Sequence, residues 1–244
     1  MADTRHVTLI SAHRGGSVVP GEPAAERYRR AIELGVDYIE FDVRRTLDGV
    51  IAVCHDPRTA SGRPIAKFAY SELTDELGGE ALTFHELLDL ADGRVGLHLD
   101  LKESGYETLA VSNALEACPV ERLVVTGDDA VIRKVKDEFP SVKVGLSLGE
   151  DLEGAPPWVK LAVRLRELFP HGLVRDSHAD FVALHRQLAS LNVLRYSARA
   201  GIPAWVWTVD EESEMIRFLG DSRVTTLITN RPELAVGLRR AAPE

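Results

Sequence analysis

One stretch of the sequence constrains the fold more than any other: residues 38–43, followed after a short turn by residues 50–56. Side chains of an extended strand alternate between its two faces, so Glu40 and Asp42 point the same way while their apolar neighbours point the other way. Two like charges this close are unfavourable unless a cation lies between them, and carboxylate oxygens suit a divalent ion. The pattern predicts a strand with one buried face and one metal-binding face.

The turn between these two runs adds a histidine to the predicted site. Asp48 and Gly49 form a hairpin-type dipeptide between two β-rich segments. If residues 50–54 fold back as an antiparallel arm, the expected register places His55 beside Glu40. A titratable imidazole next to a metal site is a combination suited to acid–base catalysis.

Size and charge limit the class of protein. A chain of 244 residues with 45% hydrophobic residues can bury a complete core, and we expect one domain over residues 1–244. The formal charge of −9 argues against nucleic-acid binding, which requires clustered lysine and arginine. The N-terminus lacks an apolar signal region, and no run approaches the roughly 18 apolar residues that span a bilayer. We therefore expect a cytoplasmic protein without stable membrane association, in which Cys54 and Cys118 are reduced and structural.

Most of the chain alternates between strand-like and helix-like segments. Strands are predicted at residues 7–12, 38–43, 50–54, 95–102, 123–126, 142–146, 181–184, 202–209 and 225–229, and helices at residues 23–34, 83–91, 129–139, 158–169, 188–201, 211–219 and 232–240. This alternation predicts an α/β fold, a closed (β/α)8 TIM barrel with an extra antiparallel β-arm after the second strand. An open doubly wound sheet is the alternative, but the loop after the first strand, residues 13–16, does not match its glycine-rich phosphate turn.

Charged residues lie at or near the predicted carboxyl ends of several strands, where a TIM barrel carries its active site. The convergent set comprises three carboxylates (Glu40, Asp42 and Asp100), two histidines (His13 and His55) and two cations (Arg14 and Lys102). The carboxylates supply hard oxygen ligands for Mg²⁺ or Ca²⁺, and the cations suit an anionic phosphate. Two imidazoles beside a metal-bound phosphate can divide the proton transfers between nucleophile and leaving group. Phosphodiester cleavage is the reaction that this set favours.

In order along the chain, these residues and their neighbours resemble the motif series of the glycerophosphodiester phosphodiesterase family. The matching segments are His13-Arg14-Gly15, Glu40-x-Asp42, Asp48-Gly49, His55-Asp56, Leu99-Asp100-Leu101-Lys102, Trp207-Thr208-Val209 and Thr229-Asn230-Arg231-Pro232. The resemblance implies a TIM-barrel hydrolase of lipid and glycerol metabolism that cleaves small-molecule glycerophosphodiesters to glycerol 3-phosphate and an alcohol. It also implies one divalent cation, Mg²⁺ or Ca²⁺ with Mn²⁺ as a further option.

The same resemblance implies the roles of individual residues. Glu40, Asp42 and Asp100 would be the metal ligands, His13 and His55 the acid–base pair, and Arg14 and Lys102 the phosphate-binding residues. The chain departs from the family pattern at three points. The usual third ligand is a glutamate, and here it is Asp100. The usual Pro-Glu-Asn-Thr is Gly-Glu-Pro-Ala at residues 21–24, which keeps Glu22 as a substrate-pocket residue. The usual final Thr-Asp-Arg-Pro has Asn230 in place of the aspartate, and we interpret this segment as a structural turn.

Two further side chains have two open interpretations each. Trp207 either packs at the end of the barrel or stacks on the glycerol moiety of a substrate. His98 shares the face of Asp100 but lies two residues deeper, so it is either an interior hydrogen-bonded histidine or a support for that ligand.

Two other functions are compatible with the same residues. A lysophospholipid phosphodiesterase of the phospholipase D kind would share the metal and the histidines, but it would require an apolar surface near the barrel mouth, and no apolar loop is long enough to predict one. A non-catalytic barrel that binds a phosphate ligand would show binding without turnover. Comparison of lysophospholipid with glycerophosphocholine as substrates tests the first alternative, and turnover of glycerophosphodiesters in the presence of divalent metal tests the second.

Overall fold

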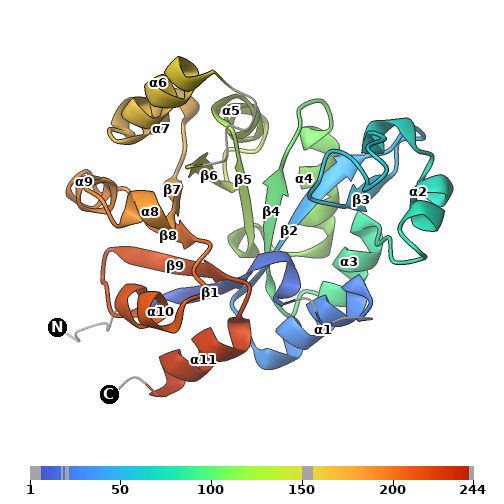
Figure 1. Ribbon diagram of the computed structural model, residues 1–244, viewed down its shortest axis with the longest axis horizontal. Coiled ribbons are helices and arrows are strands. Elements are labelled where there is room, and N and C mark those ends of the chain that lie inside the picture. Colours follow the sequence, from blue (N-terminus) through green and yellow to red (C-terminus); the bar gives the residue numbers. More distant parts are fainter. Residues whose placement is uncertain (1–6, 18, 20–21, 150–155, 242–244) are drawn as a thin grey trace.

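The computed structural model of the protein describes residues 7–17, 19, 22–149 and 156–241, which form a ring of strands surrounded by helices (Figure 1). The strands are β1 (Leu9–Ala12), β2 (Tyr38–Arg45), β3 (Ile51–Val53), β4 (Gly96–Leu101), β5 (Leu123–Gly127), β6 (Lys143–Leu148), β7 (Phe181–His185), β8 (Ala204–Trp207) and β9 (Val224–Thr229). The α-helices are α1 (Ala24–Leu34), α2 (Tyr70–Glu76), α3 (Phe84–Ala91), α4 (Glu107–Ala117), α5 (Asp129–Glu138), α6 (Pro157–Glu167), α7 (His171–Ser177), α8 (Arg186–Ala189), α9 (Val193–Arg199), α10 (Glu212–Leu219) and α11 (Pro232–Ala241). Short 3-10 helices are η1 (His13–Gly15), η2 (Ile65–Lys67) and η3 (Val120–Arg122).

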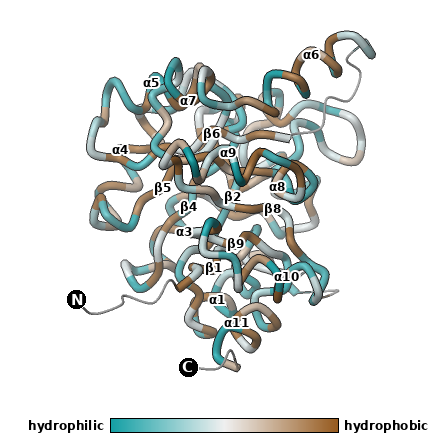
Figure 2. The backbone as a smooth tube through the Cα atoms, turned by 90° about the vertical axis from the view of Figure 1, so that its left-hand side faces the viewer, coloured by the Kyte–Doolittle hydropathy of each residue, from teal (hydrophilic) through white to brown (hydrophobic). Residues whose placement is uncertain are grey.

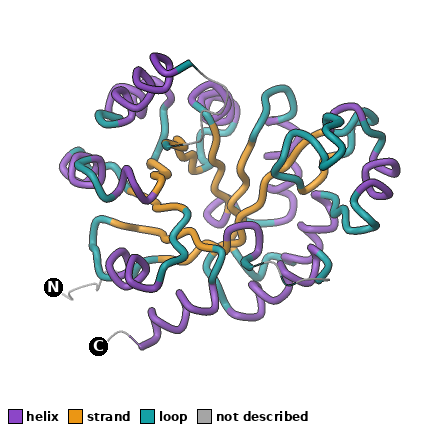
Figure 3. Tube along the Cα trace, viewed as in Figure 1, coloured by secondary structure: helices purple, strands orange, loops and turns teal. Residues whose placement is uncertain are grey.

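The strands close into a barrel. The hydrogen-bonded order is β1-β9-β8-β7-β6-β5-β4-β2-β3, and β1 also pairs with β2, which completes a parallel ring. Strand β3 pairs with β2, runs antiparallel to it and lies outside the ring. The predicted TIM barrel with an extra arm is confirmed, and the helices surround the strands (Figure 3).

Local signals explain several helix boundaries. Thr83 Oγ1 accepts a hydrogen bond from the Glu86 amide at 3.1 Å while the Glu86 carboxylate accepts from the Thr83 amide at 2.8 Å, so the predicted capping box begins α3. The helix predictions were incomplete. Helices α2, α4 and α7 form in stretches for which no helix range was predicted, and residues 188–201 form the end of α8 and then α9 instead of one helix. Apolar residues continue at helical spacing across that break, so periodicity alone does not reveal it.

The lower interior of the barrel is filled by aromatic rings from the amino ends of the strands. The rings of Phe181 and Trp205 stack with centroids 4.7 Å apart, and Tyr38 lies 5.3 Å from Trp205. A Cβ atom at Gly145 would lie 2.2 Å from the Phe181 ring, so this position requires a glycine. This plug closes the amino end of the barrel and leaves polar side chains at the carboxyl ends of the strands, the barrel mouth.

The helical layer is not uniform. In the view of Figure 2, α6 projects at one corner beyond the other helices. Among the described residues, no helix is both long and apolar enough to cross a lipid bilayer. Both cysteines are free, in agreement with the prediction of reduced thiols.

Candidate active site

Strands β2 and β4 bring three carboxylates together at the barrel mouth. Their parallel register pairs Asp42 with Asp100, and Glu40 lies two residues earlier on the same face of β2. Each of the three side chains offers an oxygen atom, and these atoms lie within 4.8 Å of one another. All three residues are largely buried. The alternation seen in the sequence therefore produces a real cluster, because neighbouring parallel strands present equivalent faces.

The donor atoms of this cluster suit a hard divalent cation. Asp42 Oδ2 and Asp100 Oδ1 are buried and accept no hydrogen bond from any residue that the structure describes. Burial, together with the neighbouring Asp42 and Asp100 carboxylates, raises the pKa of Glu40 well above its usual value. A bound cation would coordinate these oxygens and relieve the repulsion among the three carboxylates.

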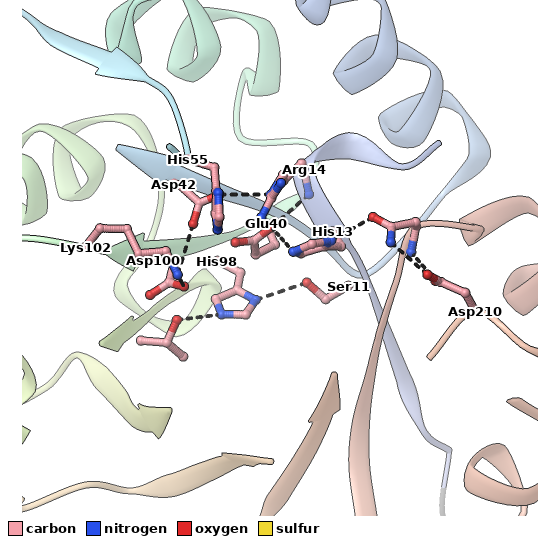
Figure 4. Close-up of polar contacts among 12 residues, drawn as sticks. Ser11, His13, Arg14, Glu40, Asp42, His55, His98, Asp100, Lys102 and Asp210 are labelled. Atoms are coloured by element: carbon pink, nitrogen blue, oxygen red, sulfur yellow. Dashed lines mark hydrogen bonds and ion pairs between the residues drawn. The ribbon is translucent and has the colours of Figure 1, made fainter. Parts of the chain in front are cut away.

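Two basic side chains border the carboxylates (Figure 4). The Lys102 ammonium lies 2.7 Å from Asp100 Oδ2 and 3.3 Å from Asp42 Oδ1. Arg14 Nε lies 3.2 Å from Asp42 Oδ2. Both side chains line the pocket and present positive charge next to the position that suits a metal ion. This arrangement fits an anion that contacts the cation and both basic groups.

The loop after β1 has a backbone conformation that few sequences permit. The backbone of Arg14 adopts the left-handed helical conformation, with φ 50°, and its amide donates a hydrogen bond to Glu40 Oε2 at 2.8 Å. Gly15 and Gly16 also have positive φ, and a Cβ atom on them would lie 2.9 Å from Tyr28 and Pro232, respectively. The two glycines therefore let the loop turn tightly over the end of β2.

His13 has one ring nitrogen fixed by an amide. Asn230 Nδ2 and the Asn230 amide both donate to the Asp210 carboxylate at 2.8 Å, which turns Asn230 Oδ1 toward His13 Nδ1 at 2.7 Å. An amide oxygen only accepts, so Nδ1 of His13 carries the proton and Nε2 is left unprotonated, 3.9 Å from Glu40 Oε2. Burial lowers the pKa of His13 despite this hydrogen bond. His13 is therefore a neutral imidazole with its basic nitrogen in the pocket.

His55 has a different environment and a different position from the predicted one. The β2–β3 ladder pairs Val43 with Val53, and His55 follows it in a loop, so the expected pairing beside Glu40 is wrong. The last backbone hydrogen bond between the arm and β2 runs from the Cys54 amide to the Asp42 carbonyl, so the arm ends before His55. His55 nevertheless lines the same pocket as Glu40.

A carboxylate, not an amide, orients His55. Its Nδ1 lies 2.7 Å from Asp56 Oδ1, and this hydrogen bond lowers the pKa of Asp56. Arg44 holds the loop from below, since its Nε donates to the His55 carbonyl at 2.8 Å and its guanidinium pairs with Glu103. Asp56 therefore fixes the orientation of the His55 ring at the pocket wall.

His98 lies in the interior of the barrel. Its Nδ1 is 3.1 Å from Ser11 Oγ and its Nε2 is 3.0 Å from Thr126 Oγ1. Burial lowers the pKa of His98 to about 4. Of the two open interpretations, the interior hydrogen-bonded histidine is the one that the structure bears out, because both ring nitrogens contact hydroxyl groups and not Asp100.

A pocket of about 390 Å³ contains most of these side chains and the predicted Trp207. Trp207 Nε1 donates to the Ala183 carbonyl at 3.0 Å, which fixes the ring at the pocket wall. Trp207 also lines a neighbouring cavity of about 600 Å³. Glu22 is not brought to the pocket wall, because its carboxylate pairs with Arg30 on α1.

Two polar residues that hold His13 were not predicted. The sequence indicates a structural turn at Asn230 and predicts no role for Asp210, directly after the Trp207-Thr208-Val209 motif. The contact between Asn230 and His13 spans 217 residues of sequence and arises from closure of the ring between β1 and β9. The only signal was their position after two strands that end at the mouth.

Known proteins share this architecture. Residues 13–151, more than half of the chain, match the Glycerophosphoryl diester phosphodiesterase family. The chain is 27% identical to a glycerophosphodiester phosphodiesterase of Caldanaerobacter subterraneus subsp. tengcongensis, over 96% of this chain and 98% of that protein. It is 29% identical to a probable glycerophosphodiester phosphodiesterase 2 of Mycobacterium tuberculosis, over 85% and 81% of the two chains.

Solved structures show the same fold. A glycerophosphodiester phosphodiesterase from Parabacteroides distasonis superimposes with a TM-score of 0.78 at 21% identity, covering 97% of this chain and 98% of that one. An Oleispira antarctica phosphodiesterase, solved in complex with the product sn-glycerol-3-phosphate, superimposes with a TM-score of 0.72 at 15% identity over 96% and 98%. The chain belongs to the glycerophosphoryl diester phosphodiesterase family and is an enzyme of that type.

Proposed function

We propose that the protein hydrolyses glycerophosphodiesters to glycerol 3-phosphate and an alcohol with the help of one divalent cation. The proposal is carried by one observation. A cluster of carboxylate oxygens lies in the same pocket region as two histidines, one of which is hydrogen-bonded to an amide and the other to a carboxylate. The carboxylates of Glu40, Asp42 and Asp100 would hold the cation. The names of the relatives agree with this reaction.

The substrate phosphate would lie between the cation and the basic side chains. A divalent cation, Mg²⁺ or Ca²⁺, supplies Lewis-acid polarisation of a phosphate oxygen when bound. Arg14 and Lys102 would contact the remaining phosphate oxygens, because both already border the carboxylates from the pocket side. The two basic groups also neutralise the charge that develops on the phosphate during displacement.

The two histidines would act at opposite ends of the reaction. His13 presents an unprotonated Nε2, so it accepts the proton of the nucleophile. His55, whose Nδ1 contacts the Asp56 carboxylate, donates a proton to the leaving alkoxide. The nucleophile is either the substrate's own glycerol hydroxyl, which forms a cyclic phosphate, or water. Appearance of a cyclic phosphate during turnover identifies the first route, and its absence in single-turnover product analysis identifies the second.

A metal-screened hydrolysis assay tests the proposal. The purified chain, stripped with chelator, is supplied separately with Mg²⁺, Ca²⁺ and Mn²⁺ and assayed on glycerophosphocholine, glycerophosphoethanolamine and glycerophosphoinositol. We expect release of glycerol 3-phosphate only with metal. Inactivity with all three ions, together with retained binding of glycerol 3-phosphate, would assign the protein to the non-catalytic class.

A second substrate class is favoured by one specific feature. The cavity beyond Trp207 is lined by Leu168, Leu188 and Leu191, which could accommodate an acyl chain attached to the glycerol. The human relative Lysophospholipase D GDPD1 is 24% identical over 93% of this chain and 85% of that protein. Comparison of kcat/KM for lysophosphatidylcholine and glycerophosphocholine decides between the two classes.

A further inference from the structure

Helix α6 turns its apolar face to solvent. Trp158, Leu161, Leu165 and Phe169, two residues past the helix end, are 72%, 62%, 54% and 69% exposed. Their spacing of three to four residues places them along one side of the helix, and we call this row the α6 stripe. An amphipathic helix normally packs such a row against the core, whereas here the buried side chain of α6 is Glu167.

Basic residues flank the stripe on both sides. At 100° per residue, Arg166 lies along one edge of the stripe and Arg164 along the other, while Lys160 lies on the opposite side of the helix. Lys160 and Arg166 are exposed, and Arg164 reaches inward to Glu167 at 2.7 Å. Up to Glu167, α6 contains no acidic residue. The helix therefore combines an exposed apolar row with positively charged margins.

The positive charge of this region contrasts with the rest of the chain. Residues 156–199 contain seven lysine and arginine residues against three aspartate and glutamate residues, a formal charge of +4 in a chain of −9. Three acidic residues, Glu150, Asp151 and Glu153, precede this segment and lie outside the described residues. With them included, residues 150–199 carry +1, so the remaining chain carries −10. Residues 156–199 are therefore less acidic than the rest of the chain, because they contain few aspartate and glutamate residues.

The stripe lies beside the barrel mouth. Arg164 on α6 and Leu168 just after it line the 600 Å³ cavity that shares Trp207 with the catalytic pocket. Leu191, which is 59% exposed, lines the same cavity from the α8–α9 connection. Figure 2 shows α6 as the helix that projects farthest at this corner. A binding partner in contact with the α6 stripe would therefore lie close to the barrel mouth.

We propose that α6 docks the protein on an anionic lipid bilayer, lying in the plane of the headgroups with the stripe inserted. Aromatic residues and leucine favour the boundary between headgroups and acyl chains, and flanking lysine and arginine attract anionic headgroups. A second copy of the chain is a poorer occupant. Two copies meeting through this face would juxtapose their basic margins, and a row of four side chains is small beside the roughly 1,200–2,000 Å² of a stable interface. The proposal does not depend on hydrolytic activity.

Vesicle co-sedimentation tests the proposal. We expect the full chain to bind vesicles of phosphatidylglycerol and phosphatidylcholine at least about tenfold more tightly than vesicles of phosphatidylcholine alone. The double variant L161E/L165E should lose at least about tenfold in binding, because it places two charges in the inserted row. The matched control is I216E on α10, where Ile216 is 55% exposed on another helix, and its binding should equal that of the wild type. Equal sedimentation of wild type and L161E/L165E overturns the proposal.

Two further measurements keep the result interpretable. Trp158 is the exposed tryptophan, since Trp205 is buried and Trp207 half-buried, so anionic vesicles should shift the emission of the wild type to shorter wavelength but not that of W158F. R166A should weaken binding to anionic vesicles about fivefold. Hydrolysis of soluble glycerophosphocholine should be unchanged in L161E/L165E, which controls for folding. A concentration-dependent dimer in sedimentation velocity that disappears in this variant, with no vesicle binding by the wild type, would assign the stripe to self-association instead.

Discussion

The two halves of the barrel contribute different chemistry to one pocket. Every ionisable side chain on the pocket wall belongs to the chain up to residue 102: His13, Arg14, Glu40, His55, His98, Asp100 and Lys102. Every later wall residue is uncharged: Thr126, Ser147, Ala183, Trp207, Thr208 and Ile228. The first half thus concentrates the proposed metal, phosphate and proton chemistry, and the second half shapes the space in which a substrate lies.

This division follows from strand order. In the ring, β1, β2 and β4 are neighbours, so carboxylates from β2 and β4 and the loop after β1 converge within a few ångströms. The two halves are also connected, because Asp210 and Asn230 from the second half hold His13 of the first and Thr126 contacts His98. Substitutions in the charged half should therefore act on the rate of chemistry, and those in the neutral half on binding.

The largest effect is expected from Glu40→Gln. It removes one carboxylate from the oxygen cluster, so kcat should fall by about a thousandfold or more, and excess metal should not restore it. In metal-free protein the same change should raise the free energy of unfolding by about 1–2 kcal/mol, because Glu40 is a buried carboxylate held among like charges. Activity and urea unfolding under chelator measure the two effects. A loss of both activity and stability would mean that the cluster is a structural ion network.

Removal of either histidine is expected to have the next largest effect. His13→Ala and His55→Ala should each lower kcat by about 10²–10⁴ without a change in circular dichroism. The two are distinguished by a glycerophosphodiester of p-nitrophenol, whose leaving group needs no proton. On that substrate His55→Ala should recover most of its lost rate and His13→Ala should not. Recovery in His13→Ala alone would reverse the two roles.

His98 is expected to control the acid stability of the charged half. Burial depresses its pKa from 6.5 to about 4, so the unfolded chain binds a proton below pH 6.5 that the native chain does not bind. The native state should therefore lose roughly 3 kcal/mol from this group as the pH falls from 6.5 to 4. Urea unfolding at several pH values, compared with His98→Gln, isolates the contribution. An identical pH slope in the variant would contradict the assignment.

Much of the fold and half of the site follow from local pattern. Alternation placed Glu40 and Asp42 on one face, and a parallel neighbour with Asp100 completed the cluster as predicted. The register of His55 could not be obtained this way, since it depends on the residue at which the β2–β3 ladder ends. A local signal cannot show where a two-stranded ladder stops, because that is decided by contacts of the loop beyond it.

Two other features depend on tertiary structure. The hydrogen bond between His13 and Asn230 forms only when the first and last strands of the ring pair. The amphipathic pattern of α6 shows that one face is apolar, but the direction in which that face points is set by the packing of the whole helical layer. The absence of a long apolar loop therefore does not reveal the apolar surface that α6 presents near the mouth.

The crossing contact between the halves is tested by Asn230→Ala. Loss of the amide frees the His13 ring from its fixed tautomer and leaves the Asp210 carboxylate without this donor, so kcat should fall by about 10–100-fold. Asn230→Asp should not rescue it, because a second carboxylate would face Asp210. The exposed Asn192 on the α8–α9 connection provides the control, and Asn192→Ala should match the wild type. Wild-type kcat in Asn230→Ala would show that His13 needs no orienting partner.

The smallest effect is expected from Trp207→Phe, and it tests the neutral half directly. The change keeps an aromatic ring on the pocket wall but removes the Nε1 donor that fixes the ring to the Ala183 carbonyl at 3.0 Å. Because no charge or proton donor is lost, the ground state and the transition state should be weakened alike, which raises KM about 3–10-fold and changes kcat less than about threefold. Steady-state kinetics on glycerophosphocholine separate the two constants. A fall in kcat as large as that of the histidine variants would mean that Trp207 acts on the reacting atoms, and the division between a chemical half and a shaping half would then be wrong.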